Sequence, residues 1–169
     1  SRVLGLGYPG GPAVEKAAKT GNKNAFKFPR VHLNNGFDFS FSGVKTAVIN
    51  EIHKINQRNE SININDVAAS FQEAVTDVLV DNTINAAKFK DAKTICMAGG
   101  VASNSYLKNK LADAAEKHGF SLYSPPPILC TDNAAMIACA GYFEYKNNNF
   151  ADLSLNAFPS LQLGENIIM

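Results

Sequence analysis

The sequence predicts an α/β fold in which helices cover a sheet. Two short apolar runs, Thr94–Ala98 and Phe120–Tyr123, have the length and composition of buried strands. Longer segments whose apolar residues recur at helical spacing lie before, between and after these runs. Glycine-marked turns separate the two kinds of segment, and such an alternation of helices with buried strands is typical of α/β proteins.

The first 36 residues are expected to hold one short helix. Pro12 follows a stretch rich in glycine and proline, and it suits the first position of a helix because its missing N–H would be unpaired there anyway. A helix through residues 13–17 should end near Gly21 as a C-terminal cap. Residues 22–36 predict a loop or a short strand, with a turn at Asn34-Asn35-Gly36.

A strand and two helices should follow. Apolar and polar residues alternate over Phe37–Phe41, which predicts a strand. Ser42 or Gly43 then opens a helix that runs to about Asn56. After a polar linker, Asn65 is the expected N-cap of a long helix from Asp66 to about Phe89. Its apolar residues recur at helical spacing at Val67, Phe71, Val75, Val78, Leu79 and Ile84.

The last part of the chain should continue the alternation. Gly99-Gly100 ends the first buried run, and residues 102–117 predict an amphipathic helix that ends at Gly119. The second buried run leads into a proline loop. A final helix over about Asn133–Lys146 is rich in alanine and should pack closely, and residues 147–169 predict an irregular tail.

Composition limits the class of protein. The 169 residues are 46% apolar and 18% charged with a net charge of +1, so a core can form, but charge gives no reason to expect nucleic-acid binding by this chain alone. Three widely spaced cysteines without a CxxC pair indicate free thiols and a cytoplasmic compartment. No apolar run reaches the roughly 18–20 residues of a membrane span. The start, which has neither an initiator Met nor a signal-peptide layout, is expected of a piece of a longer polypeptide.

Three turns are candidate binding elements, because each leads into a predicted helix whose free N–H groups attract phosphate and carboxylate groups. They are Tyr8–Pro12, Ala98–Asn104 and Cys130–Asn133. Gly99 and Gly100 lack a Cβ, so a ligand can approach the backbone closely. Asn104, expected one turn into the helix, could hold a sugar hydroxyl or a base edge through its amide. The same pattern equally fits a tight turn followed by a surface asparagine.

Other polar residues near these turns also have two explanations. Glu15, one turn into the first helix, could accept hydrogen bonds from a ribose or be a surface carboxylate. Asp132 could face a metal ion, but the pattern alone favours a capping role, and one carboxylate is too few for a metal site. Ser42 and Lys45 could hold a phosphate at a helix start, although Lys45 fits a solvated surface equally well. None of the three histidines has the spacing of metal ligands.

The motifs become specific as an ordered set. In chain order they are LGYPGGP at 6–12, FDFSFSGVKT at 37–46, ASFQEAV at 69–75, MAGGV at 97–101 with Asn104, and CTDNAAMIA at 130–138. This set resembles the TsaD family, the tRNA threonylcarbamoyladenosine synthases once labelled O-sialoglycoprotein endopeptidases or glycoproteases. The resemblance covers about residues 1–146, and the SGVKT segment is more similar to the bacterial and organellar branch than to the archaeal one.

The resemblance implies a fold and an activity. The fold would be one lobe of an actin-like and Hsp70-like (ASKHA) ATPase, the carboxyl-terminal one, with a mixed sheet flanked by helices over residues 1–146 and a tail over 147–169. The activity would be transfer of threonylcarbamoyl from threonylcarbamoyl-AMP to the adenosine next to the anticodon of tRNAs that read ANN codons.

The resemblance also implies site residues. The family's ligand-binding positions map onto Gly11, Glu15 and Asn104, and Gly99 and Gly100 would line the same site for ATP, ADP or threonylcarbamoyl-AMP. No residue of this chain is expected to be catalytic in its own right. The family's metal ligand in the Thr-Asp-Asn motif maps onto Asp132, and the metal would be Fe or Zn.

The resemblance is incomplete in one respect. The family's HxxxH metal ligands, its Ser-Gly-Gly-His phosphate loop and the Asp before the Gly-Tyr-Pro-Gly-Gly turn have no counterpart in this chain. We therefore expect the chain to supply one of three protein metal ligands and one wall of the cleft, and to be inactive by itself. The implied partners are tRNA, a TsaB-like paralogue, a TsaE-like ATPase and, through an exposed cleft face, a second copy of the chain, but no membrane.

Three other interpretations stay open from the sequence. Another ASKHA ATPase or sugar kinase would share the glycine turns but lack the FSGVK and CTDNAAM segments. The non-catalytic dimerising paralogue generally lacks the aspartate that is present here as Asp132. The older label implies a metalloprotease, but this chain contains neither an HExxH motif nor a recognisable nucleophile motif to support it.

Overall fold

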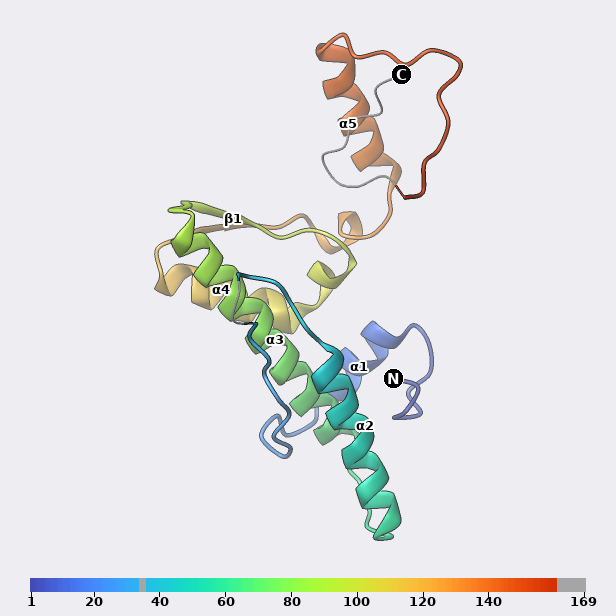
Figure 1. The fold of residues 1–169 in the computed structure, drawn as a ribbon, viewed down its shortest axis with the longest axis vertical. Coiled ribbons are helices and arrows are strands. Elements are labelled where there is room, and N and C mark those ends of the chain that lie inside the picture. Colours follow the sequence, from blue (N-terminus) through green and yellow to red (C-terminus); the bar gives the residue numbers. More distant parts are fainter. Residues whose placement is uncertain (34–35, 161–169) are drawn as a thin grey trace. The chain divides into compact units, whose positions relative to one another are not determined.

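The computed structural model describes residues 1–33 and 36–160, which divide into two units, Ser1–Thr131 and Asp132–Met169 (Figure 1). The helices and strands of the first unit are α1 (Gly10–Ala18), α2 (Ser42–Gln57), α3 (Ile64–Phe89), β1 (Thr94–Cys96), α4 (Ser105–Lys117) and β2 (Ser121–Tyr123). Short 3₁₀ turns, η1 (Gly100–Ser103) and η2 (Pro127–Leu129), precede α4 and follow β2. The second unit contains α5 (Ala134–Lys146).

Helix α3 is the central element of the first unit, because α1, α2 and α4 all pack against it (Figure 1). Its amino-terminal half carries small buried residues, Ala68, Ala69 and Ala74, which let α1 approach closely through Ala17 and Ala18. Its carboxyl-terminal half forms a second apolar cluster with β1 and α4, made of Val80, Ile84, Ala87, Ile95, Leu107, Leu111 and Ala115. The two clusters fix both ends of α3 against different partners.

The sheet of the described residues consists of β1 and β2, which run parallel with Ile95 opposite Leu122. Helix α4 connects them and contacts β2, so β1, α4 and β2 form a parallel strand–helix–strand unit. The predicted mixture of helices and strands is therefore confirmed, but the expected burial of the strands is wrong: in β1 only Ile95 is buried, and β2 has no buried residue. In such a unit the chain leaves the first strand at the carboxyl edge of the sheet, which is where α/β proteins bind ligands.

Two helix starts differ from the sequence-based expectation. Helix α1 begins at Gly10, two residues before Pro12, and it ends at Ala18, so Gly21 is not its cap. Gly21 is required for another reason, because a Cβ there would lie 1.9 Å from the carbonyl oxygen of Asn65. The N-cap of α3 is Asn63, whose side chain accepts a hydrogen bond from the amide of Asn65 at 3.0 Å.

The predicted strand at Phe37–Phe41 is wrong. Within it only Phe39 forms a β-bridge, with His32. The buried side chain of Asn82 on α3 instead donates to the carbonyl oxygens of Phe37 and Asp38, at 3.4 and 3.2 Å. The Asn82 amide therefore pairs with backbone carbonyl groups that a neighbouring strand would otherwise have to satisfy. Alternation of apolar residues within one segment does not provide such a neighbouring strand.

The remaining expectations concern the end of the chain. Helix α5 agrees with the predicted final helix, and within its own unit none of its side chains is buried. The predicted turn at Asn34-Asn35-Gly36 and the predicted tail at 147–169 lie partly outside the described residues, which exclude 34–35 and 161–169. Across the part of the chain that the structure describes, no helix has both the length and the hydropathy to cross a lipid bilayer.

Candidate functional site

The turn after β1 leads directly to the start of α4. Gly99 has a φ of 90°, a conformation that side-chain-bearing residues rarely adopt, so glycine is needed there. A Cβ added at Gly99 or Gly100 would meet no atom within 4 Å. The backbone of this turn is therefore open to close approach, as the sequence predicted.

Asn104 lies between η1 and α4 and is the N-cap of α4. The sequence placed it one turn inside a longer helix, and this placement is wrong because η1 ends at Ser103. Its Oδ1 accepts a hydrogen bond from the amide of Leu107 at 2.8 Å, and its Nδ2 donates to Oε1 of Gln72 at 3.1 Å. Both ends of the Asn104 amide therefore have a defined partner.

A cavity of about 270 Å³ joins the start of α1 to the start of α4. Gly10 and Gly11 line it from α1, Gln72 and Thr76 from α3, and Asn104 from the cap of α4. Its apolar lining consists of Val14, Phe71, Val75, Leu79, Val101 and Leu107. We call it the helix-start cavity. Residues 11 and 104, which are far apart in the sequence, line the same cavity, whereas Gly99 and Gly100 are not among the described residues that line it.

Glu15 lies on the other side of Gln72. Its Oε1 accepts two hydrogen bonds from Ser105, at 2.9 Å from the amide nitrogen and 2.6 Å from the hydroxyl. Glu15, Gln72, Ser105 and Tyr106 line a second cavity of about 330 Å³, together with Ala18, Lys19, Gly21, Lys23, Ala69 and Asn109. Gln72 is the residue that the linings of the helix-start cavity and this polar cavity have in common.

A network of charges ties α3 to α4 beside the polar cavity. Glu73 accepts a hydrogen bond from Tyr106 and pairs with Lys23 at 3.2 Å and with Lys110 at 3.0 Å. Burial alone would raise the pKa of Glu73, but the hydrogen bonds from Tyr106 and the lysines outweigh burial, so its pKa is below the ordinary value. The pKa of Lys23 is raised by its hydrogen bond with Tyr106 and by Glu73.

The same network includes Asp77, one turn further along α3. It pairs with Lys110 from α4 and with Arg30 from the loop after α1. Burial would raise the pKa of Asp77, but hydrogen bonds from Lys110 and Arg30 bring it below its ordinary value. The network therefore favours the ionised carboxylates and holds the first turns of α4 in place beside α3.

Asp132 is the first residue of the second unit, and Asn133, not Asp132, caps α5 by accepting from the amide of Met136 at 2.9 Å. The capping role that the pattern favoured for Asp132 is therefore wrong. The role of metal ligand that the family motif implies for Asp132 stays a prediction. Within residues 1–33 and 36–160, no three His, Cys, Asp or Glu side chains come together as a metal-binding group.

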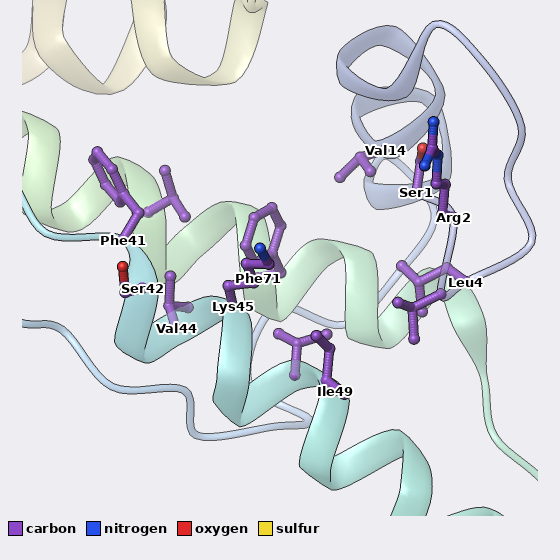
Figure 2. A pocket seen from close by; sticks show the side chains of 13 residues that line it. Ser1, Arg2, Leu4, Val14, Phe41, Ser42, Val44, Lys45, Ile49 and Phe71 are labelled. Atoms are coloured by element: carbon purple, nitrogen blue, oxygen red, sulfur yellow. The ribbon is translucent and has the colours of Figure 1, made fainter.

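Another cavity, of about 620 Å³, is lined by the first residues of the chain and by residues of α2 and α3. Figure 2 shows Val44, Lys45 and Ile49 of α2 beside Phe71 of α3, with Leu4 and Val14 also lining the space. Ser42 and Lys45, which were considered as a phosphate site, thus line a mainly apolar cavity, and both residues are exposed.

Gln72, Ser105 and Tyr106 were assigned no role from the sequence. Gln72 is part of the ASFQEAV segment, so a motif signal existed, but its contact with Asn104 joins residues 32 positions apart. Ser105 and Tyr106 contact Glu15 and Glu73 across similar or larger separations. Only the packing of α1 and α4 against α3 brings these residues together.

Comparison with known proteins gives a consistent family. The TsaD family model, described as tRNA N6-adenosine threonylcarbamoyltransferase, matches residues 1–139. A tRNA N6-adenosine threonylcarbamoyltransferase of Clostridium novyi is 54% identical over 167 residues, which cover 98% of this chain and 49% of that protein. The Desulfitobacterium hafniense protein of the same name is 52% identical over 164 residues, or 96% of this chain and 48% of the relative. The chain thus spans about half the length of these curated relatives.

Proposed function

The chain belongs to the TsaD family of tRNA N6-adenosine threonylcarbamoyltransferases, and we propose that it supplies one wall of the site that holds threonylcarbamoyl-AMP. One observation carries this proposal. Gly11 at the start of α1 and Asn104 at the start of α4 line the same cavity. The start of α1 offers a backbone N–H group at Gly11 and a positive dipole end to a negatively charged ligand. The start of α4 adds a second positive dipole end and the Asn104 side chain, while the amides of Ser105 and Leu107 are already paired with Glu15 and Asn104.

The proposed lobe is the carboxyl-terminal one of an actin-like, Hsp70-like ATPase fold. The strand–helix–strand unit of β1, α4 and β2, with further helices packed against it, fits one layer of such a lobe. The remaining wall of the cleft would come from the half of the family's length that this chain does not span. This assignment rests on the family, because the fold of the chain by itself is a mixed α/β arrangement.

The reaction we propose for the whole protein is acyl transfer. The exocyclic amine of the tRNA adenosine forms a C–N bond with the carbamoyl carbon, the bond from that carbon to the phosphate oxygen of threonylcarbamoyl-AMP breaks, and AMP leaves. The amine gives up one proton. Negative charge grows on the carbonyl oxygen and on the departing phosphate, and donors fixed in place before the reaction stabilise such charge. The chain would contribute backbone N–H groups at Gly11 and an amide at Asn104.

The chain cannot hold the implied Fe or Zn ion with its described residues. We propose Asp132 as one ligand on the family's motif, but no group of three donors exists in the described residues, and the three histidines of the chain have no HxxxH spacing. The ion would therefore need ligands from outside this chain. We expect the isolated chain to bind it weakly and derive no step of the reaction from it.

The wider assignments follow from the family and remain proposals. They are tRNA as substrate, a TsaB-like paralogue and a TsaE-like ATPase as partners, self-association of the chain through its cleft face, and action in the cytoplasm. The family assignment speaks against a different ASKHA kinase or a protease, because the matching relatives are named as transferases.

The nucleotide part of the proposal is tested with ATP and ADP as probes in titration calorimetry on the chain. Gly11→Ala adds a methyl group where no atom lies within 4 Å, so the fold should tolerate it while a ligand at the backbone should not. We expect an affinity loss of about tenfold or more. Ser61→Thr, which adds a methyl group outside both cavities, is the matched control. Unchanged affinity in Gly11→Ala would exclude ligand contact at this turn.

The activity part is tested by threonylcarbamoyl transfer to tRNA, with Fe or Zn titrated into the isolated chain. We expect no turnover, because the chain spans about half of its relatives' length and lacks two of the three ligands that the family motif requires. Robust turnover by the chain alone would overturn this expectation.

A further inference from the structure

Gln72 holds a position between the two cavities that the proposed site comprises. It lies on α3, the helix against which both α1 and α4 pack, and it lines the helix-start cavity and the polar cavity. Its side-chain oxygen accepts the hydrogen bond from Nδ2 of Asn104 at 3.1 Å. Gln72 therefore contacts Asn104, the N-cap residue of α4, which also lines the helix-start cavity.

This contact helps to hold the Asn104 amide in one orientation. An asparagine amide has nearly the same shape at its oxygen and nitrogen ends, so its partners decide which end points where. The amide of Leu107 can only donate, and it lies 2.8 Å from Oδ1 of Asn104. Turning the amide over would place Nδ2 against this donor and Oδ1 against the oxygen of Gln72. The Leu107 amide thus selects one orientation, and the Gln72 oxygen accepts from Nδ2 in that orientation and holds it there.

This orientation determines what Asn104 offers to a ligand. Nδ2 carries two hydrogens, of which one is donated to Gln72. Among the described residues no second acceptor for Nδ2 is present, and Asn104 lines the cavity beside Gly11. The remaining N–H is therefore a donor for an acceptor atom in the cavity, such as a ribose oxygen or a ring nitrogen of a nucleoside.

We propose that Gln72 is a positioning residue that fixes the Asn104 amide so that its free N–H is directed at a nucleoside in the helix-start cavity. The inference rests on the proposed nucleotide site and adds a residue to it. Gln72 acts through Asn104 and not by touching the reacting atoms. If Gln72 served only to fill space, the volume of its side chain would be sufficient. Positioning of Asn104 requires in addition the side-chain oxygen of Gln72 as a hydrogen-bond acceptor.

Two substitutions separate acceptor from volume. Gln72→Met keeps the length of the side chain but has no amide oxygen, and Gln72→Glu keeps an oxygen acceptor of the same reach. Adenosine is the probe, since an uncharged nucleoside is not repelled by the carboxylate that Gln72→Glu introduces. Gln57→Met, at the exposed end of α2, is the matched control for a glutamine-to-methionine change.

The readouts are adenosine affinity by NMR titration and the side-chain amide resonances of Asn104. We expect Gln72→Met to lose about tenfold in affinity and to shift the Asn104 amide signals, Gln72→Glu to restore both to within about threefold, and Gln57→Met to change neither. Thermal unfolding of each variant verifies that it is folded.

The outcomes distinguish the inference from the function on which it rests. The positioning role is overturned if Gln72→Met binds adenosine as tightly as the wild-type chain. It is also overturned if a folded Gln72→Glu binds adenosine as weakly as Gln72→Met. Either result leaves the nucleotide site standing. Wild-type chain that binds neither adenosine nor ATP overturns the proposed nucleotide site and the inference with it.

Discussion

Glu15 on α1 accepts two hydrogen bonds from Ser105 on α4 through a single carboxylate oxygen, across 90 residues of sequence. Ser105 is the first residue of α4, so the carboxylate lies at the positive end of that helix. The sequence offered Glu15 as a ribose ligand or a surface carboxylate. In the structure it joins two helices, and a ribose hydroxyl would have to use its other oxygen or replace Ser105.

We predict that Glu15→Ala lowers the free energy of unfolding by about 1–2 kcal/mol, because it removes two charge-assisted hydrogen bonds and leaves the first amide of α4 unpaired. Ser105→Ala removes only the hydroxyl bond and should cost about 0.5–1 kcal/mol. The double variant should lose less than the sum of the two, since the changes share one contact. Urea unfolding measures all three.

The control for this prediction is Glu51→Ala on α2. Its carboxylate pairs with Lys54 on the same helix at 3.5 Å in an exposed position, which contributes only a few tenths of a kcal/mol. Additive losses at Glu15 and Ser105 would contradict the direct link between them.

The second prediction concerns acid. The folded chain holds the pKa values of Glu73 and Asp77 below their ordinary values of 4.5 and 3.8. A depressed folded pKa gives stability that is complete above the unfolded pKa and is lost as pH falls through the folded value. The contribution of these two carboxylates to the free energy of unfolding should therefore be constant near neutral pH. It should decrease as the pH is lowered below about 4.5.

The slope of unfolding free energy against pH tests this directly. Asp77→Asn and Glu73→Gln should each flatten the acid slope, because the unfolded chain then binds one proton fewer relative to the folded one. Asp91→Asn is the control, as Asp91 pairs with Lys93 in a highly exposed position. An acid slope that is the same in all three variants would contradict the role of the network.

The third prediction compares Gly21, which the sequence predicted to cap a helix, with Gly11, which the family resemblance placed at the ligand. Gly21→Ala would place a methyl group 1.9 Å from the carbonyl oxygen of Asn65, and backbone at the start of α3 cannot move without breaking its cap. We expect a loss of about 3 kcal/mol or more, at the upper end of overpacking costs. Gly11→Ala meets open space inside a helix and should be neutral or slightly stabilising. Equal unfolding midpoints for the two variants would contradict this reasoning.

The contrast between Gly21 and Gly11 illustrates what the sequence could predict. Local signals placed α2, β1, β2 and α5 within a few residues, because caps, glycines and apolar periodicity act over short separations. The failed strand at Phe37–Phe41 depended on a partner strand, and the true role of Gly21 depended on Asn65, which belongs to another helix. Such contacts arise from tertiary packing and leave no periodic trace.

The candidate site divides in the same way. Gly11 and Asn104 could be named as candidates from motifs, since short glycine turns are local features, but the capping role of Asn104 was not expected. Gln72 and Ser105 could not be assigned a role, because their functions exist only when α1 and α4 pack on α3. A sequence therefore identifies glycine turns and helix starts more readily than the side chains that hold them in place.

The last prediction tests whether Asn104 acts as a cap, a donor or both. Asn104→Asp keeps an oxygen that can accept from the amide of Leu107, so the cap should survive with a stability change below about 0.5 kcal/mol, whereas Asn104→Ala should cost about 0.5–2 kcal/mol. Both variants lose the Nδ2 donor. If the donor binds the nucleoside, both should lose about tenfold in adenosine affinity despite their different stabilities.

Asn63→Asp provides the matched control, since Asn63 caps α3 in the same way and lines neither cavity at the helix starts. It should change neither stability nor adenosine affinity appreciably. Wild-type affinity in Asn104→Asp would mean that the cap alone matters and that the ligand does not use the amide donor. Because stability and affinity are expected to respond to different atoms of one side chain, a loss of both in proportion would instead indicate that weaker binding only reflects a less stable fold.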